Sequence, residues 1–322
     1  MGMKAEPKIS RTSAIVGAAV WAILLFIRTS PSYETELIDK ILLLGVLVIV
    51  PLGMSLVATL DQSGKQVLLY RLALRAQPFG AAAAVASFFV EQGTRSALLG
   101  ALWLVVTALI GLFGLWRLLF RGLLTADEIC IVAGLIYLLV GGMWLVMSRL
   151  GMQPLGFGDT IVLLTAVHFH FAGFAAPILA GLAGRIINGR GAARQLFQFA
   201  AVGIIAGTPI VATGITFSPL VAFIGAIVIS LGLFLLAIVV LVWVIRSVGS
   251  LPAQLLLGVS AGSSAFGMVL ACLYAYSLVT KTLIIDIPHM AMTHGVVNAF
   301  GFALCGLLAW SLVPLELRSS RD

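Results

Sequence analysis

The sequence predicts an all-α membrane protein, a polytopic bundle of about ten transmembrane helices with both termini in the cytoplasm. Hydrophobic residues make up 61% of the 322-residue chain and charged residues only 10%, against roughly 45–50% and 25% in soluble domains. Apolar runs of about 20 residues, the length that crosses a bilayer, recur along the chain. Most basic residues fall in every second connection between these runs, and so on one side of the membrane, as the positive-inside rule describes.

The ten candidate spans follow, in order, from apolar runs bounded by charges or by clusters of glycine, proline and serine. The first resembles a signal peptide, but IRTSPSYE follows it in place of a small-residue cleavage site, so a retained anchor is expected. The third is the weakest because Arg71, Arg75 and Pro78 interrupt it. The predicted spans are 13 to 29, 38 to 60, 67 to 90, 95 to 116, 127 to 148, 159 to 183, 195 to 216, 219 to 245, 252 to 279 and 289 to 313.

The distribution of lysine and arginine sets the orientation. Fourteen of the basic residues fall on one side and five on the other, which predicts that both termini are cytoplasmic. The first group is Lys4, Lys8, Arg11, Lys65, Arg71, Arg75, Arg117, Arg121, Arg185, Arg190, Arg194, Arg246, Arg318 and Arg321; the second is Arg28, Lys40, Arg95, Arg149 and Lys281. The spans leave no room for a large soluble domain, so residues 1–322 are expected to form a single integral membrane domain.

The remaining composition argues against nucleic-acid binding and gives the cysteines no special role. The net charge of +7 comes from basic residues scattered singly between apolar runs, which argues against nucleic-acid binding. The three cysteines lie in separate apolar runs without metal-site spacing and are expected to be small packing residues.

All four histidines lie in two short stretches, TAVHFHFAGF at 165–174 and PHMAMTHGVVNAFGF at 288–302. The predicted topology places both stretches in the outer half of the membrane, with His289 near the interface. His168 and His170 differ by about 200° around a regular helix, so one helix cannot present both to one metal ion.

Helical spacing predicts which polar side chains share a face. Thr165 shares a face with His168, and Asp159 returns to the face of His170 about 16 Å away along the axis. On the tenth span His294 is followed at i+4 by Asn298. That pair is costly against lipid, so we expect it to face the bundle interior and to line a polar pocket with one sixth-span histidine. The alternative is that each imidazole only bonds a neighbouring helix, which contributes about 0.6 kcal/mol.

The two histidine stretches resemble the signature of the YndJ-like family of bacterial integral membrane proteins. The resemblance implies a multi-helix membrane fold in the bacterial cytoplasmic membrane and brings no dependable activity. Some longer members carry an additional carboxy-terminal region, and no function housed there is expected to apply. The matching residues are His168, His170, Phe171, Gly173, His294, Gly295, Asn298 and Gly301.

The first functional hypothesis is an intramembrane enzyme that isomerises, cyclises or hydrates a lipophilic substrate such as an isoprenoid. Histidine exchanges protons near neutral pH, and an amide can orient an imidazole or bind a developing oxyanion. The expected partner is a membrane lipid or a lipophilic small molecule, and the sequence identifies no cofactor. The predicted catalytic residues are His168, His170, His294, Asp159 and Asn298, with Thr165, Thr293 and His289 contacting the substrate.

Three other classes stay open. A transporter or channel would use the histidines as a proton relay, supported by the number of spans and by Pro209, which would break a helix near a site. A copper, zinc or haem protein would use the imidazoles as ligands, although second-shell carboxylates are missing within the spans. A structural membrane subunit would use the polar residues only to hold partners.

Overall fold

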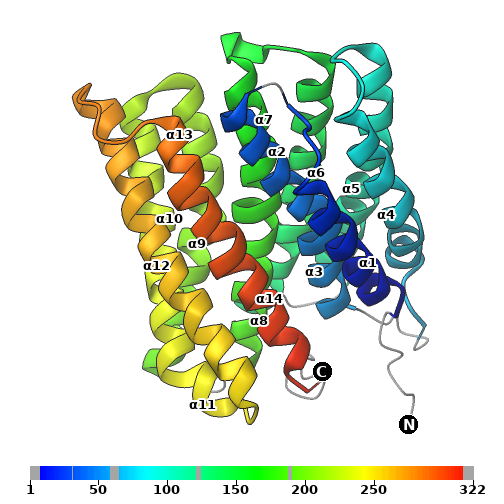
Figure 1. The fold of residues 1–322 in the computed structure, drawn as a ribbon. Helices are drawn as coiled ribbons and strands as arrows, with labels where there is room; N and C mark the ends of the chain where they lie inside the picture. The colour runs from blue at the N-terminus through cyan, green and yellow to red at the C-terminus, as the bar shows by residue number, and fades with distance from the viewer. Residues whose placement is uncertain (1–7, 31, 59–64, 121–124, 188–190, 315–322) are drawn as a thin grey trace. The chain divides into compact units, whose positions relative to one another are not determined.

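The computed structural model describes residues 8–30, 32–58, 65–120, 125–187 and 191–314, and within these ranges it contains helices and short connections but no β-strand. Ten helical runs in these ranges each overlap one predicted span, which confirms a polytopic helical bundle (Figure 1). The runs are α1 (Lys8–Leu24); α2 (Tyr33–Leu44), η1 (Gly45–Ile49) and α3 (Val50–Leu56); α4 (Leu68–Ser87); α5 (Thr94–Phe120); α6 (Ala126–Leu150); α7 (Asp159–His168), η3 (Phe169–Ala175) and α8 (Ala176–Ile186); α9 (Ala192–Phe217); α10 (Pro219–Val239), η4 (Val240–Val244) and α11 (Ile245–Ser247); α12 (Leu251–Thr280); and α13 (Ile287–Met290), η5 (Ala291–Gly295), η6 (Val297–Leu304) and α14 (Cys305–Leu312). A short 3₁₀ turn, η2 (Pro154–Gly156), precedes α7.

Eight of the ten runs are long and apolar enough to cross a membrane, and the exceptions within the described residues are α1 and α4. α1 has 17 residues and begins at Lys8, and α4 carries Arg71 and Arg75 in its first half. α1 is therefore too short within the described residues, and α4 is interrupted by charged side chains, which are expensive in hydrocarbon. The weakness predicted for the third span is therefore found in α4.

The orientation of the termini stays a prediction. Lys4, Arg121, Arg190, Arg318 and Arg321, which contribute to the charge asymmetry, lie outside the described residues, as do positions 59 and 60 of the second predicted span.

The chain divides into two compact units. Unit 1 comprises residues 1–123 and 132–175, and unit 2 comprises residues 124–131 and 176–322. The long helix α6 and the run formed by α7, η3 and α8 each contribute residues to both units.

Within unit 1, α1 approaches the π-helical segment η1 closely. A Cβ atom at Gly17 would overlap the carbonyl oxygen of Leu47, so only glycine allows this contact. Two side chains of α1 then bond backbone carbonyls across the interface: Ser10 Oγ donates to Pro51 O at 2.6 Å, and Trp21 Nε1 donates to Lys40 O at 2.7 Å. In a membrane, backbone and side-chain polar groups need such internal partners.

Unit 2 is built around α9, α10 and α12, which lie side by side (Figure 1). Glycines line the contact between α9 and α10, where a Cβ at Gly203 would lie 2.9 Å from the Cα of Gly232. Small residues at helix crossings let backbones approach and gain van der Waals contact. α9 continues unbroken through Pro209, so the helix break that the transporter hypothesis expected there is absent.

Two ion pairs join the start of α6 to other helices of unit 2. Asp127 lies 3.5 Å from Arg194, and Glu128 lies 3.4 Å from Arg185. All four side chains are mostly buried, and acids in the first turn also interact favourably with the helix dipole. These acidic residues therefore have a structural role.

Five π-helical segments, η1, η3, η4, η5 and η6, interrupt the α-helices of the described chain. π-Helical turns are rare and occur frequently at functional sites. Three of the five, η3, η5 and η6, contain or adjoin the two histidine stretches.

Glycine packing gives a test of the helix contacts in unit 2. A Cβ at Gly214 of α9 would overlap the backbone nitrogen of Ala222 in α10, so Gly214→Ala should destabilise the protein by about 1–3 kcal/mol, the usual cost of overpacking. Gly262→Ala in α12 is the matched control, because nothing lies within 4 Å of its Cβ position. Thermal unfolding in detergent should show a lower Tm for the first variant alone; equal Tm values would contradict the packing described.

Candidate functional site

The predicted site residues divide between the two units. His168 and His170 lie in unit 1, at the junction of α7 and η3, whereas His289, His294 and Asn298 lie in unit 2 along α13, η5 and η6. A pocket shared by a sixth-span histidine and His294 stays a prediction.

His170 is fully buried, and both of its ring nitrogens are engaged. Trp103 Nε1 donates to Nε2 at 2.9 Å, and Nδ1 lies 2.8 Å from the carbonyl oxygen of Ala166. An indole N–H can only donate and a carbonyl can only accept, so the partners fix the neutral tautomer with the proton on Nδ1. The indole and imidazole rings also stack, with an interplanar angle of 16°. His170 is therefore built as a bridge between helices.

Two glycines make room for the His170 ring. A Cβ atom at Gly141 of α6 would lie 2.8 Å from Nδ1, and one at Gly45 of η1 would lie 3.2 Å from the His170 Cβ. Either contact is too close for a larger residue to be accommodated without movement. These glycines lie in different helices far from His170 in sequence, so helical spacing could not identify them.

The other predicted site residues of unit 1 form hydrogen bonds within α7 or with the turn that precedes it. His168 is exposed, with Nδ1 2.7 Å from the Leu164 carbonyl oxygen, and Thr165 Oγ1 donates to Ile161 O at 2.8 Å. Asp159 accepts from Gln153 Nε2 at 3.0 Å in the turn before α7. Thus His168 and His170 point to different environments, as their spacing predicts.

His294 and Asn298 are brought together in unit 2. His294 Nδ1 lies 2.8 Å from the carbonyl oxygen of Gly267 in α12, and Asn298 Nδ2 donates to the His294 carbonyl oxygen at 2.8 Å. Asn298 Nδ2 also lies 3.3 Å from Nδ1. Because the nearer partner, the Gly267 carbonyl, can only accept, Nδ1 carries the proton and Nε2 carries the lone pair. The half-buried imidazole is thus held in the tautomer with the proton on Nδ1.

The helix bearing His294 approaches α12 closely through glycines. A Cβ at Gly267 would overlap the Asn298 amide, and a Cβ at Gly301 would overlap the Ser263 hydroxyl. This contact explains why the tenth-span stretch combines histidine, asparagine and glycine. The polar side chains need a backbone partner on the adjacent helix, and the glycines allow the two helices to approach closely enough for that contact.

A small cavity lies farther along the same interface. It is large enough for about one water molecule. Phe302, which lines it, follows His294 by eight residues, or about 12 Å along a helix. The walls are mainly apolar and contain two serine hydroxyls: Leu179, Leu236, Ala237, Val240, Leu257, Ser260, Ala261, Ser264, Phe302 and Trp310. Ser260 Oγ donates to Phe302 O at 2.8 Å.

His289 and Thr293 lie on the exposed first turns of the same helix. His289 Nδ1 lies 2.6 Å from Asp286 Oδ1, and the His289 backbone N–H donates to the same oxygen at 2.9 Å. Hydrogen bonds from the backbone and ring of His289 hold the pKa of Asp286 below its usual value of 3.8. Thr293 Oγ1 donates to His289 O at 2.6 Å.

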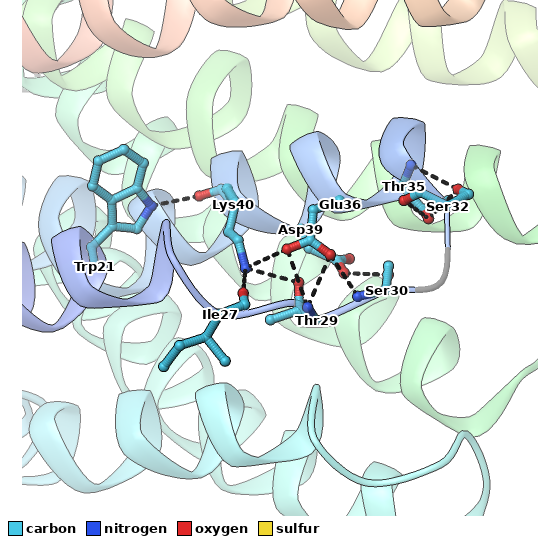
Figure 2. Close-up of polar contacts among 9 residues, drawn as sticks. All are labelled: Trp21, Ile27, Thr29, Ser30, Ser32, Thr35, Glu36, Asp39 and Lys40. Carbon is cyan, nitrogen blue, oxygen red and sulfur yellow. Dashed lines mark hydrogen bonds and ion pairs between the residues drawn. The ribbon is translucent and has the colours of Figure 1, made fainter.

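Unit 1 also contains a cluster of charged side chains, Glu36, Asp39 and Lys40, that was not predicted from the sequence (Figure 2). Lys40 Nζ bonds Glu36 Oε1 at 2.7 Å, Ile27 O at 2.6 Å and Thr29 Oγ1 at 3.2 Å. The Glu36 carboxylate accepts from the backbone nitrogens of Thr29 and Ser30. These bonds hold the connection between α1 and α2 against the first turns of α2.

The neighbouring Asp39 is 1% exposed and accepts a hydrogen bond from Ser30 Oγ. Arg149, at the end of α6, attracts it electrostatically; Arg149 Nε donates to Ser96 Oγ at 3.1 Å, and its guanidinium lies 4.5 Å from the Phe88 ring centroid. In the sequence, the i, i+4 spacing of Glu36 and Lys40 indicates an ion pair on one face of a helix. The predicted second span began at residue 38, so Glu36 was not assigned to that helix.

Potential metal ligands do not cluster in the part of the chain that the structure describes. No group of three or more histidine, cysteine, aspartate or glutamate side chains there is placed to hold a metal ion. Cys130, Cys272 and Cys305 are free thiols.

Comparison with known proteins identifies relatives but no activity. A family model described as "YndJ-like protein" matches residues 40–302. The chain is 31% identical over 212 residues to a protein of Bacillus subtilis (strain 168) described as "Uncharacterized membrane protein YndJ". This match covers 66% of the chain and only 38% of the relative. No solved structure matches the chain.

The bridging role of His170 can be tested at its partner. Trp103→Phe keeps an aromatic ring but leaves the buried Nε2 of His170 without its donor, which should cost about 1–3 kcal/mol. Denaturant unfolding should show this loss, and the ¹⁵N resonance of Nε2 should shift. Trp116→Phe is the control, since that indole stacks on Phe113 and Phe120 and has no hydrogen-bond acceptor within the described residues. A stable Trp103 variant with an unshifted resonance would refute the bridge.

The contact between Asp286 and His289 predicts a pH dependence. Because folding lowers the pKa of Asp286, its stabilising contribution is complete above the usual value of 3.8 and is lost as the pH falls through the lowered pKa. In the His289→Gln variant, ¹³C NMR titration should show the carboxyl pKa moving back toward 3.8. An unchanged titration would show that the imidazole does not stabilise the carboxylate.

Proposed function

The chain belongs to the YndJ-like protein family, and from the geometry of unit 2 we propose that it is an intramembrane enzyme that transfers protons to and from a lipophilic substrate. The observation that carries this proposal is the imidazole of His294, held by Gly267 O with its lone pair on Nε2. The reaction is an isomerisation, cyclisation or hydration, and the substrate is a membrane lipid or isoprenoid-like molecule. The protein resides in the bacterial cytoplasmic membrane, with both termini in the cytoplasm and this site in the outer half of the bilayer.

His294 acts as the general acid and base in this proposal. Its Nε2 removes a proton from the substrate and returns one to another position, a role that contributes about 10²–10⁴-fold to rate. Asn298 positions the ring through its hydrogen bond to the His294 carbonyl, which fixes the helix turn that presents the imidazole. A positioned base is more effective than a mobile one because its orientation is already set.

The apolar part of the substrate lies against the lipid-facing side of α12 and η6. The cavity between these helices is lined by aliphatic and aromatic side chains and has room for a group of about the size of one water. The hydroxyl of Ser264 already donates to Ala261 O at 2.9 Å, so the cavity contributes shape more than polar recognition.

His170 contributes to this function by holding unit 1. Its two nitrogens are engaged by Trp103 and Ala166, so proton transfer through this ring would first have to break a buried hydrogen bond. The proposal accordingly assigns proton transfer to the tenth-span histidine and packing to the buried sixth-span histidine.

Transport is the second candidate, and one observation favours it. Asp39 and Lys40 are buried within a run that is long and apolar enough to span a membrane, and intramembrane ionisable residues often mark ion or proton pathways. In this alternative, His294 relays protons and does no chemistry on a lipid.

Solvent deuterium labelling tests the proposal with the membrane lipids themselves as candidate substrates. The protein in vesicles of native lipid is incubated in D₂O, and extracted lipids are analysed by mass spectrometry. A proton-transfer enzyme should place deuterium in a carbon-bound position of one lipid class. His294→Gln should slow this labelling by about 100-fold or more.

Ser277→Ala is the matched control on α12, because Ser277 Oγ donates to Leu273 O within its own helix. It should label lipid at the native rate. Native protein that labels no lipid, or a His294→Gln variant that labels at the native rate, would refute the enzyme. Flux of protons into dye-loaded vesicles that depends on His294 would then support transport.

A further inference from the structure

Two arginines lie on the exposed side of α4. Arg71 and Arg75 are one helical turn apart, and both are exposed. Neither guanidinium group has a hydrogen bond or an ion pair with any residue that the structure describes. Exposed apolar side chains flank them on the same helix, namely Leu68, Leu72 and Phe79. We propose that Arg71 and Arg75 together bind the phosphate group of an anionic phospholipid.

The packing of α4 on α5 places both arginines beside a membrane-spanning helix. α5 is long and apolar enough to cross a membrane, and α4 lies next to it and runs antiparallel after a short connection (Figure 1). The ring centroids of Tyr70 and Phe113 are 5.1 Å apart, and Phe113 lies about 10 Å before the end of α5 at Phe120. Arg71 therefore lies beside the last turns of this span, and Arg75 lies about 6 Å deeper.

An exposed guanidinium group at this depth needs a counter-ion. A charged side chain that faces hydrocarbon is costly, and two like charges at i and i+4 repel each other, with Cβ atoms about 5–6 Å apart. Arginine reduces the first cost by extending its charged end toward the interface, but the repulsion between Arg71 and Arg75 remains. A phosphate group between them offsets that repulsion. On a surface that faces lipid, the anion within reach is the phosphate of a headgroup.

The described charges at this end of unit 1 are basic. α1 and α4 both begin beside α3, because Ser10 Oγ donates to Pro51 O and Tyr70 Oη donates to Met54 O. Lys8, which begins α1, is exposed there. The acidic side chains that the structure describes in unit 1 lie elsewhere, at the starts of α2 and α7 and beyond the end of α4: Glu36, Asp39, Glu91 and Asp159. Among these described residues, no carboxylate competes with a lipid phosphate for the two arginines.

The chemistry of the two side chains favours a phosphodiester. A guanidinium group presents paired N–H donors that bond two phosphate oxygens at once. Phosphatidylglycerol carries a single negative charge on this group, so its phosphate fits between Arg71 and Arg75 while its acyl chains lie against Leu68, Leu72 and Phe79. Phosphatidylcholine has the same phosphate, but its choline cation is repelled by the basic surface.

Native mass spectrometry of the full chain in a neutral detergent tests the site with added phosphatidylglycerol. The native protein should bind this lipid more tightly than phosphatidylcholine. A basic residue near a membrane surface contributes about fivefold to affinity for anionic lipid, so Arg71→Gln and Arg75→Gln should each raise the Kd by that factor and the double variant by about thirtyfold. Arg71→Lys combined with Arg75→Lys keeps the charge but loses the paired donors, so its Kd should be intermediate.

The matched control removes two exposed basic side chains elsewhere, by Arg95→Gln combined with Lys281→Gln. It has the same net charge as the glutamine double variant at Arg71 and Arg75, and it should bind phosphatidylglycerol with native affinity. All four side chains are exposed, so neither double variant should lose its fold.

Four results would overturn the proposal. The first is an unchanged Kd in the glutamine double variant at Arg71 and Arg75, and the second is an equal loss of affinity in the control. The third is equal binding of phosphatidylglycerol and phosphatidylcholine by the native protein. The fourth is binding of glycerol 3-phosphate as tightly as the lipid, because the site would then accept a free phosphate ester and have no requirement for a lipid.

Discussion

The structure depends on the requirement that polar groups inside a membrane find partners within the protein. The described spans meet this requirement at two of their histidines. Trp103 supplies the donor for His170, and the Gly267 carbonyl supplies the acceptor for His294. At the start of α2 the same requirement produces the cluster around Lys40, where the ammonium group is bonded by a carboxylate, a hydroxyl and a carbonyl. These bonds explain why specific helices must approach one another at specific depths.

Glycine makes those bonds geometrically possible. Without a hydrophobic driving force between helices in lipid, close van der Waals packing brings them together. Gly141 and Gly267 permit the approach at His170 and at Asn298 respectively, where a Cβ would collide with the polar side chain itself. The glycines of the histidine regions are therefore part of each site, because they determine how near a partner backbone lies.

The fold could be predicted from hydropathy because spans are a property of local composition. All ten predicted spans correspond to helical runs, and the weak third span carries Arg71 and Arg75 as expected. The π-helical segments could not be predicted, since they depend on how side chains such as His170 pack against other helices. The partners of the histidines were equally inaccessible: Trp103 lies 67 residues from His170 and Gly267 lies 27 residues from His294. The cluster around Glu36 and Lys40 could not be predicted, because charged residues at the end of a span resemble ordinary interfacial residues.

The two histidine stretches have similar composition but their imidazoles differ in what they can do. At His170 both ring nitrogens are hydrogen-bonded, one to a donor and one to an acceptor, and the ring is fully buried. Exchange of a proton there would require two helices to separate. At His294 the fixed atom is Nδ1, held by a backbone carbonyl, so the basic nitrogen is the opposite one. A carbonyl anchor strengthens a base by orienting it, whereas an indole donor on the basic nitrogen removes it from chemistry. A motif of apolar residues with interspersed histidine therefore does not define a function by itself, because the partner atom on the adjacent helix determines which ring nitrogen carries the proton.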